Sequence, residues 1–309
     1  MALALRPIEP ADVPEAGRIC HEAFTAIAAE HNFPSAFRDP DVAIGLLSRR
    51  SARPSYGIVA ELDGSIVGSN FVDERSPIVG LGPITVDPAV QNRSVGTALM
   101  KHMLDRAIRD AAPGVRLVQA GYHNRSLCFY TRLGFAVREP LVVLQGAPLG
   151  IRLAGCVARP ATSADAEACD RLCRAVHGHD RGRELRDAVD QETASVVERD
   201  GRITGYATQI GWTGHAVAES NEDLKALVGA APSISGPGLL LPSRNTELFR
   251  WCLDHGLRMV QPMTLMSLGL YNEPAGARRR PRGGEAVRLA GHEDLPRRSE
   301  PRRARPRRS

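Results

Sequence analysis

The sequence predicts an α/β fold with a mixed sheet, built from two related halves and followed by a disordered basic tail. Three observations lead to this prediction. Several segments of the first half recur in the same order in the second half. Strand and helix patterns alternate regularly only in the later part of the first half, which is typical of a mixed sheet. The positive charge of the chain is concentrated after Ala277.

The recurring segments are a strand that runs into Arg-Pro, a hairpin, and a helix that ends on glycine. In the hairpins the turns are Asp63–Gly64 and Asp200–Gly201. Asp-Gly between two apolar, β-branched runs is the strongest short-range hairpin signal. The recurring pairs are Leu5–Asp12 with Ala158–Asp165, Tyr56–Val72 with Ser195–Ile210, and Leu127–Gly134 with Phe249–Gly256. Three matches in one order predict an ancient duplication.

The remaining elements of the first half follow from apolar periodicity. The expected elements are a strand over Ile78–Val86, a helix over Leu99–Ala112, a strand over Arg116–Tyr122, a helix over Ser126–Leu133 and a last strand over Ala136–Leu144. Gly146–Gly155, which contains Pro148, is the expected linker. The predicted division is therefore a first domain over residues 1–146, a linker over 147–155, a second domain over 156–274 and a tail over 275–309.

Length and composition are those of a soluble globular protein. The 309 residues are 43% hydrophobic and 24% charged, and no apolar run approaches the length that crosses a bilayer. The N-terminus does not resemble a secretory signal, so a cytoplasmic location without membrane contact is expected. Twelve arginines against four acidic residues give the tail a charge of +8, which leaves −3 for residues 1–277. The tail can therefore contact nucleic acid only non-specifically, through charge.

Cysteine usage predicts neither disulfides nor a metal site. Most of the six cysteines fall in apolar helical patterns, and buried free cysteine is common. Cys169, Cys173, His177 and His179 form a C-x3-C-x3-H-x-H run, but zinc ligands usually come from separate turns. We therefore interpret these cysteines as structural and predict no metal.

The segment Gln91–Thr97 joins a strand to a helix that is expected to start near Val95. Backbone N–H groups at a helix N-terminus, together with the helix dipole, favour an anion such as a pyrophosphate. Gly96 allows close approach of a ligand, and Arg93 adds a direct charge. From these residues alone, a helix N-terminus without a ligand remains an equal alternative.

Two motifs change this balance. The run Gly82–Met100 (GPITVDPAVQNRSVGTALM) resembles motif A of the GNAT (GCN5-related) N-acetyltransferases, whose consensus is Q/R-x-x-G-x-G/A. Asn124–Phe135 (NRSLCFYTRLGF) resembles motif B of that family, with its asparagine, its tyrosine and the closing Leu-Gly-Phe. The resemblance covers residues 3–145. It implies a GNAT fold in each half, with acetyl-CoA as co-substrate of the first.

The resemblance also implies roles for individual residues. The pantetheine arm would pair with the strand residues Ile84, Thr85 and Val86. The pyrophosphate would be wrapped by the loop residues Gln91, Asn92, Arg93, Ser94, Val95, Gly96 and Thr97. Asn124 would contact the cofactor, and Tyr130 would protonate the departing thiolate. A tyrosine with an ordinary pKa near 10 suits that role at neutral pH, although Tyr130 as a core aromatic is the alternative.

Two points of the first half depart from the family pattern. Ser94 replaces the first glycine of the loop, and the phosphate cradle survives this change unless the position needs a positive φ. No glutamate lies on the strand before the loop to act as a base. His123, Asp73 and Glu74 are the candidates, and an amine that is neutral when bound would need no base.

The second half lacks the counterparts of these motifs. No Q-x-x-G-x-G loop follows its hairpin, and Cys252 stands where Tyr130 would fall. Gly238–Tyr271 resembles the C-terminal domain of tandem GNAT proteins of the YitH type, which implies a degenerate partner domain. Cys252 with His255 as a nucleophilic pair is an alternative without an oxyanion loop to support it.

The predicted function is an N-acetyltransferase that moves an acetyl group from acetyl-CoA to a primary amine of a small molecule or a peptide. The amine would attack directly, with the oxyanion stabilised by a backbone N–H of Ile84–Val86. The acceptor pocket is expected to include Phe24, His31, Phe33 and Phe37. The alternative is a non-catalytic sensor that binds acyl-CoA and regulates a partner.

Overall fold

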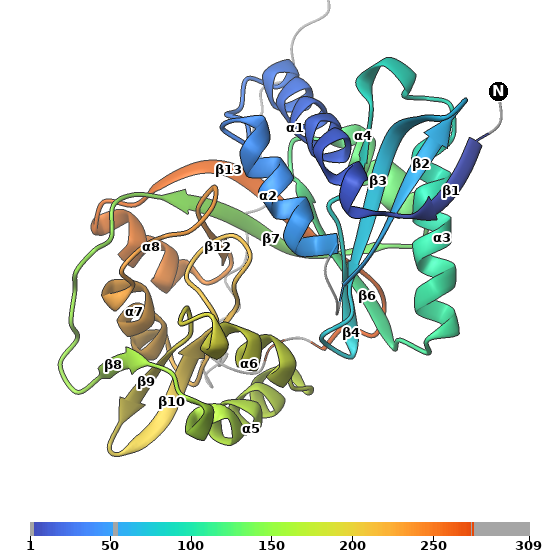
Figure 1. Cartoon of the computed structure of the whole chain (residues 1–309). Coiled ribbons are helices and arrows are strands. Elements are labelled where there is room, and N and C mark those ends of the chain that lie inside the picture. Colours follow the sequence, from blue (N-terminus) through green and yellow to red (C-terminus); the bar gives the residue numbers. More distant parts are fainter. Residues whose placement is uncertain (1–2, 52–54, 273, 275–309) are drawn as a thin grey trace, which may run out of the picture. The chain divides into compact units, whose positions relative to one another are not determined.

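The elements of the first half follow from its apolar patterns in nearly the expected places (Figure 1). The computed structural model describes residues 3–51, 55–272 and 274, and the predicted basic tail lies outside them. In chain order the elements are β1 (Leu3–Pro7), η1 (Pro10–Asp12), α1 (Val13–Glu30), α2 (Pro40–Ser51), β2 (Ser55–Leu62), β3 (Ser65–Asp73), β4 (Ile78–Leu81), β5 (Thr85–Val86), η2 (Pro88–Val90), α3 (Val95–Arg109), β6 (Gly114–Ala120), α4 (Asn124–Arg132) and β7 (Ala136–Gln145).

The second half repeats this order almost element by element. Its elements are β8 (Val157–Pro160), η3 (Ser163–Asp165), α5 (Ala166–His177), α6 (Gly182–Asp190), β9 (Ser195–Arg199), β10 (Arg202–Ala207), β11 (Ala216–Ala218), α7 (Asn221–Ala230), β12 (Leu239–Pro242), α8 (Thr246–Asp254) and β13 (Arg258–Gly269). Both Asp-Gly hairpin turns are present, between β2 and β3 and between β9 and β10. The described residues of both halves belong to one compact unit.

An ion-pair motif is repeated at the start of each half. Arg6 at the end of β1 lies 2.6 Å from Asp12, and Arg159 at the end of β8 lies 2.8 Å from Asp165. Each arginine also contacts a glutamate on the neighbouring strand, Glu61 in one case and Glu198 in the other. Each aspartate accepts a backbone N–H three residues before it and so closes the turn into the helix. The shared motif explains why the Arg-Pro segment recurs in the sequence.

The first sheet is mixed, as predicted. Its strand order is β1-β2-β3-β4-β6-β13-β7-β12, with β5 paired to β3. The pair β4–β6 is parallel and the others are antiparallel. The second sheet has the order β11-β10-β9-β8 and is antiparallel throughout.

The expected single strand over Ile78–Val86 is divided into β4 and β5. β4 pairs with β6 over Ile78–Gly80 only. Gly82 then takes a φ of 121°, a conformation that L side chains rarely adopt, and Pro83 has no N–H to donate. β5 continues along β3 but not along β6. The sheet therefore opens between β5 and the C-terminal part of β6.

Strand β13 completes the sheet of the first half. It pairs with β6 from Met263↔Ala120 to Gly269↔Gly114 and with β7 along its other edge. β6 and β7 do not pair with each other, so both depend on β13 for backbone hydrogen bonds. Without it, each strand would present an unpaired edge. The strand that ends the second half in sequence thus lies in the middle of the first sheet (Figure 1).

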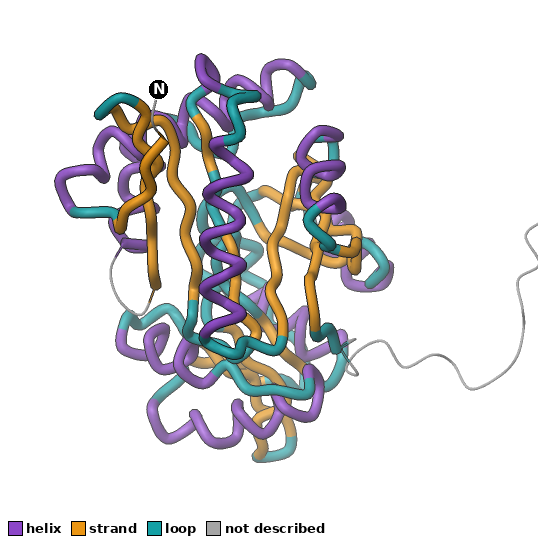
Figure 2. The backbone as a smooth tube through the Cα atoms, turned by 90° about the vertical axis from the view of Figure 1, so that its right-hand side faces the viewer, coloured by secondary structure: helices purple, strands orange, loops and turns teal. Residues whose placement is uncertain are grey.

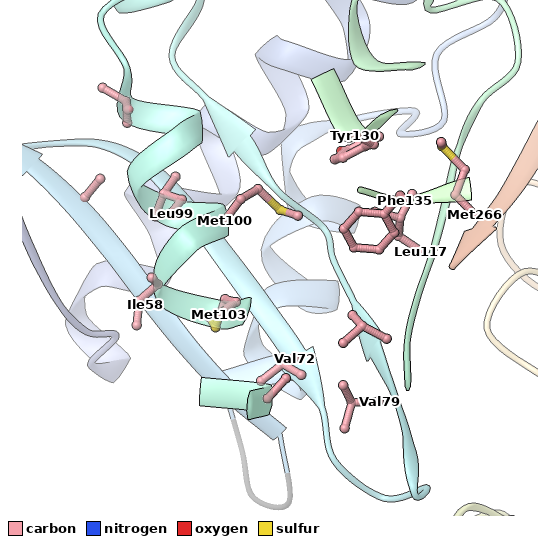
Figure 3. Close-up of a cluster of buried hydrophobic side chains, with 14 of the residues drawn as sticks. Ile58, Val72, Val79, Leu99, Met100, Met103, Leu117, Tyr130, Phe135 and Met266 are labelled. Atoms are coloured by element: carbon pink, nitrogen blue, oxygen red, sulfur yellow. The ribbon is translucent and has the colours of Figure 1, made fainter. Parts of the chain in front are cut away.

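Helices cover both faces of the first sheet. α3 covers one face and runs in the same general direction as the strands (Figure 2), and its apolar side packs into a core with residues of β2, β6 and α4. Met266 of β13 is fully buried in this core, near Leu117 and Phe135 (Figure 3). α1 and α2 form a second core with Phe71 of β3. Within the described ranges, no helix has both the length and the apolarity needed to cross a membrane.

The contribution of β13 to the first core can be tested with two methionines on the same strand. Met266 is fully buried, whereas Met259 is 46% exposed. We expect Met266→Ala to lower the free energy of unfolding by about 2–5 kcal/mol, because it leaves a cavity among well-packed side chains. Met259→Ala should change it by less than about 0.5 kcal/mol. Urea denaturation measures both, and equal effects of the two variants would contradict the role of β13.

Candidate active site

A cleft with a volume of about 2700 Å³ includes the opening between β5 and the C-terminal part of β6. It is lined by the N-terminus of α3, by β6, by α4 and by the end of α1. Residues of the second half, including His179 and Arg181, line it as well. Most of the residues predicted from motif A and motif B are brought together along this cleft.

The N-terminus of α3 is open toward the cleft. Ser94, Val95, Gly96 and Thr97 all line it. The N-cap residue Ser94 makes no side-chain capping bond, and the first turn contains no acidic residue. The first N–H groups of a helix have no intrahelical partner, so this end can accept an anion. Arg93, in contrast, is exposed and is not among the lining residues.

Gly96 leaves room beside this turn. A Cβ added at Gly96 would meet Val86 and Phe129 only at 3.7 and 3.9 Å. Packing within the protein therefore does not require glycine here. The space that a side chain would fill is available to a ligand, so the turn fits the pyrophosphate of coenzyme A.

Ser94 has a left-handed backbone, with φ 63° and ψ 6°. The sequence analysis expected the change from glycine to serine to affect the loop only if this position needs a positive φ, and it does. For a residue with a Cβ this conformation costs about 1 kcal/mol. Asn92 is also left-handed, with φ 69°, but asparagine adopts this conformation several times more often than other residues.

Arg125 holds the loop in place, and the sequence analysis did not find it. Its guanidinium donates to Gln91 Oε1 at 3.0 Å and to Asn92 Oδ1 at 2.6 Å. The bonds tie the loop to the first turn of α4. The signal that could have revealed Arg125 is a basic residue directly after Asn124 of motif B.

The segment Ile84–Val86 forms one wall of the cleft. Thr85 is buried, and its hydroxyl lies 3.3 Å from that of Ser69. β5 pairs with β3 along one edge, and among the described strands none pairs with its other edge. Backbone groups on this edge can therefore pair with an extended ligand such as pantetheine.

Gln119 faces the same opening from β6. It is only 5% exposed, and both its amide nitrogen and its amide oxygen are buried without a hydrogen-bond partner among the described residues. Buried polar atoms are nearly always paired in folded proteins. Gln119 lines the cleft, so its amide is placed to bond to a ligand. In the sequence it was only one polar residue in a strand.

Asn124 and Tyr130 lie on α4 and line the cleft. The Tyr130 ring packs against Phe129 and Phe135 in the core (Figure 3), and the residue is 7% exposed. Burial raises the pKa of Tyr130 to about 12. The phenol therefore keeps its proton at neutral pH and remains a hydrogen-bond donor.

The three candidate bases already have partners. Burial acts to raise the pKa of Asp73, but bonds to Arg75 and the charge of Arg50 hold it below its ordinary value. Glu74 is paired with Arg106 at 2.5 Å. The Nδ1 atom of His123 accepts the N–H of Ser126 at 3.4 Å and so caps α4.

His31 also lies at the cleft, but its hydrogen bond differs from those of these three candidates. Its Nδ1 lies 3.0 Å from the carbonyl oxygen of Ile27. A carbonyl can only accept, so Nδ1 carries a hydrogen, and in the neutral ring Nε2 is then the nitrogen with the lone pair. The ring packs against Tyr122 at 5.4 Å and lines the cleft.

The expected acceptor pocket is partly assembled. Phe24 and Phe37 pack edge to face at 5.3 Å, and both line the cleft. Phe33 stacks on Tyr122 at 4.1 Å but is not among the lining residues. The walls are therefore aromatic near α1, with His31 as a polar group.

The corresponding helix start in the second half is closed. Ser220 caps α7 by accepting the N–H of Asp223, and the first turn contains Glu222 and Asp223. These carboxylates occupy the end of the helix that an anion would need. Cys252 is fully buried, and burial raises its pKa to about 12, so it is not a reactive thiol. Among the described residues no group of three or more metal-ligating side chains was found.

Comparison with protein families identifies the segment that carries this cleft. Residues 21–135 match the acetyltransferase (GNAT) family. This segment belongs to that family. The GNAT segment contains both predicted motifs. A search of curated proteins found no match to the chain.

Solved structures extend the likeness beyond the GNAT segment. A Pyrococcus horikoshii protein described as an acetyltransferase has a TM-score of 0.68 at 18% identity, covering 89% of this chain and 94% of its own. A GCN5-related N-acetyltransferase from Sphaerobacter thermophilus has a TM-score of 0.60 at 17% identity, covering 88% and 96%. A tandem GNAT protein from the clavulanic acid biosynthesis pathway has a TM-score of 0.53 at 14% identity, covering 87% and 98%. At these identities the likeness shows the fold of both halves and no more.

The positive φ of Ser94 predicts how a glycine at this position changes stability. We expect Ser94→Gly to raise the free energy of unfolding by about 0.5–1 kcal/mol, because glycine adopts a positive φ without strain. Its affinity for coenzyme A should be equal or higher. Ser94→Ala is the matched control: it keeps the Cβ and loses no capping bond, so it should behave like the wild type. Urea denaturation and calorimetric titration measure these effects, and a less stable Ser94→Gly variant would contradict the assignment.

Proposed function

We propose that the protein transfers the acetyl group of acetyl-CoA to a primary amine of a small molecule or a peptide. The observation that carries this proposal is the uncapped N-terminus of α3, which opens onto the unpaired edge of β5. The first suits a pyrophosphate and the second suits an extended pantetheine arm. The GNAT segment supports acetyl transfer as the reaction class.

Each part of the reaction has a supporting group. The amine nitrogen attacks the thioester carbonyl directly, and a backbone N–H on the free edge of Ile84–Val86 stabilises the negative charge that develops on oxygen. The carbon–sulfur bond then breaks, and the hydroxyl of Tyr130 donates to the departing thiolate. Because burial keeps Tyr130 protonated, this donor is present throughout the neutral pH range.

His31 is the residue that we propose to take the proton of the attacking amine. Its bond to the carbonyl of Ile27 leaves the Nε2 lone pair available. The charged or capping roles of Asp73, Glu74 and His123 make these three residues poorer acceptors.

We further propose that the second half binds no acetyl-CoA and supports the first. The capped and acidic start of α7 and the strand β13 support this division of roles. Calorimetric titration with coenzyme A should then give one site per chain.

Release of coenzyme A from acetyl-CoA, measured against a panel of primary amines, tests the proposal. We expect turnover with at least one amine and a loss of about 10-fold or more in kcat for Tyr130→Phe. The rate should not fall up to about pH 10, where an unshifted tyrosine would lose its proton. Tyr56→Phe, outside the cleft, is the control. Binding of acetyl-CoA without turnover of any amine would favour the acyl-CoA sensor instead.

The role of His31 has its own test. His31→Gln keeps a polar side chain but cannot take a proton, so kcat should fall by about 100-fold or more, the usual contribution of a general base. His21→Gln on the same helix serves as control. Unchanged kcat in His31→Gln would show that the amine needs no base from this residue.

A further inference from the structure

A group of basic side chains lies in the part of the cleft where the second half meets the first. Arg116 comes from β6, while His179 and Arg181 come from the segment between α5 and α6. All three line the cleft. Burial and then the charge of Arg181 lower the pKa of Arg116, and burial and then the charge of Arg116 lower that of His179. The three groups are thus close enough to act on one another.

Arg116 has donors without acceptors. Its Nε and Nη2 atoms are buried and have no hydrogen-bond partner among the described residues, and neither has Nε2 of His179. The guanidinium carbon lies 5.5 Å from the centre of the Tyr271 ring, a cation–π contact that leaves these donors unsatisfied. A buried donor without a partner costs about 1–3 kcal/mol, and more when it is charged.

The neighbouring arginines are already neutralised. Arg181 donates to both carboxylate oxygens of Glu184, at 2.8 and 2.6 Å. Arg75 donates to Asp73 at 2.6 Å. No ion pair of Arg116 is found among the described residues. The cluster therefore has one positive charge in excess, and it resides on Arg116.

Arg116 projects away from the α3 core. Val115 and Leu117, on either side of it in β6, are buried in that core, and successive side chains of a strand alternate between faces. Arg116 is paired with Gly80, in the last described pair before β4 and β6 part. Three residues of strand, about 10 Å, separate it from Gln119, whose side chain lies on the opposite face of β6. Both residues nevertheless line the same cleft, so a small molecule in the cleft can contact Arg116.

We propose that Arg116, with Arg181 beside it, binds an anionic group of the acceptor, so that the substrate is a small amine that also carries a carboxylate or a phosphate. This inference rests on the proposed acetyl transfer and narrows its acceptor class. The anion supplies the acceptors that Nε and Nη2 of Arg116 lack, and it neutralises the excess charge of the cluster.

The test compares matched acceptors in the coenzyme A release assay. Standard amino acids are paired with their carboxamides, and phosphoethanolamine is paired with ethanolamine, so that the two arms separate a carboxylate from a phosphate. In the wild type we expect the anionic member of one pair to be preferred. In Arg116→Gln the ratio of kcat/KM for the anionic to the neutral member should fall about 10- to 100-fold, as for a lost hydrogen bond to a charged group. Arg171→Gln, at a 60% exposed side chain that does not line the cleft, should keep the wild-type ratio.

Two further measurements separate a binding role from a structural one. The Tm of Arg116→Gln without ligand should equal or exceed that of the wild type, because an unsatisfied charge is removed. Its affinity for coenzyme A should be unchanged. A Tm several degrees lower, or equal losses on anionic and neutral acceptors, would overturn the inference and leave acetyl transfer standing.

Measuring binding separately from turnover distinguishes a failure of the anion site from a failure of the proposed acetyl transfer. Calorimetry with the same acceptors in the presence of coenzyme A should show weaker binding of the anionic member to Arg116→Gln than to the wild type. If no amine is acetylated but this difference is found, the proposed reaction fails and the anion site stands. Equal binding to both proteins would overturn the anion site.

Discussion

Strand β13 supplies the backbone hydrogen bonds that β6 and β7 both need along one edge. Because β13 follows the whole second half in sequence, the sheet that carries the cleft is complete only when the two halves fold together. β6 is thereby held on one side by β13 and on the other by three residues of β4. Its remaining length borders the cleft, so the opening beside β5 depends on a strand from the other half.

The duplicated order gives an internal comparison. α3 and α7 occupy equivalent places, yet α3 starts without a capping side chain or an acidic residue, whereas α7 starts with Ser220, Glu222 and Asp223. The first arrangement leaves N–H groups for an anion, and the second satisfies them within the protein. In the second half the helix end is capped within the protein, and in the first half it lies open to the cleft.

Three residues that line the cleft have unfavourable local features. Ser94 takes a left-handed backbone, and among the described residues neither the buried amide of Gln119 nor the charge of Arg116 has a partner. Elsewhere the same chain pairs its charges closely, as in the repeated contacts of Arg6 and Arg159. Unfavourable local features of this kind are expected at functional sites. The three residues come from different elements, and the cleft is what they share.

Local patterns in the sequence determined much of this protein: the Asp-Gly hairpins, the helix start at Val95, the mixed sheet and the loop from Gln91 to Thr97. These features depend on side-chain periodicity and turn chemistry within a few residues. The partner of β13, the sign of φ at Ser94 and the meeting of Arg116 with Arg181 were decided only by the tertiary structure. Each depends on which distant edges and charges remain unsatisfied once the two halves have packed, and no short stretch of sequence carries that information.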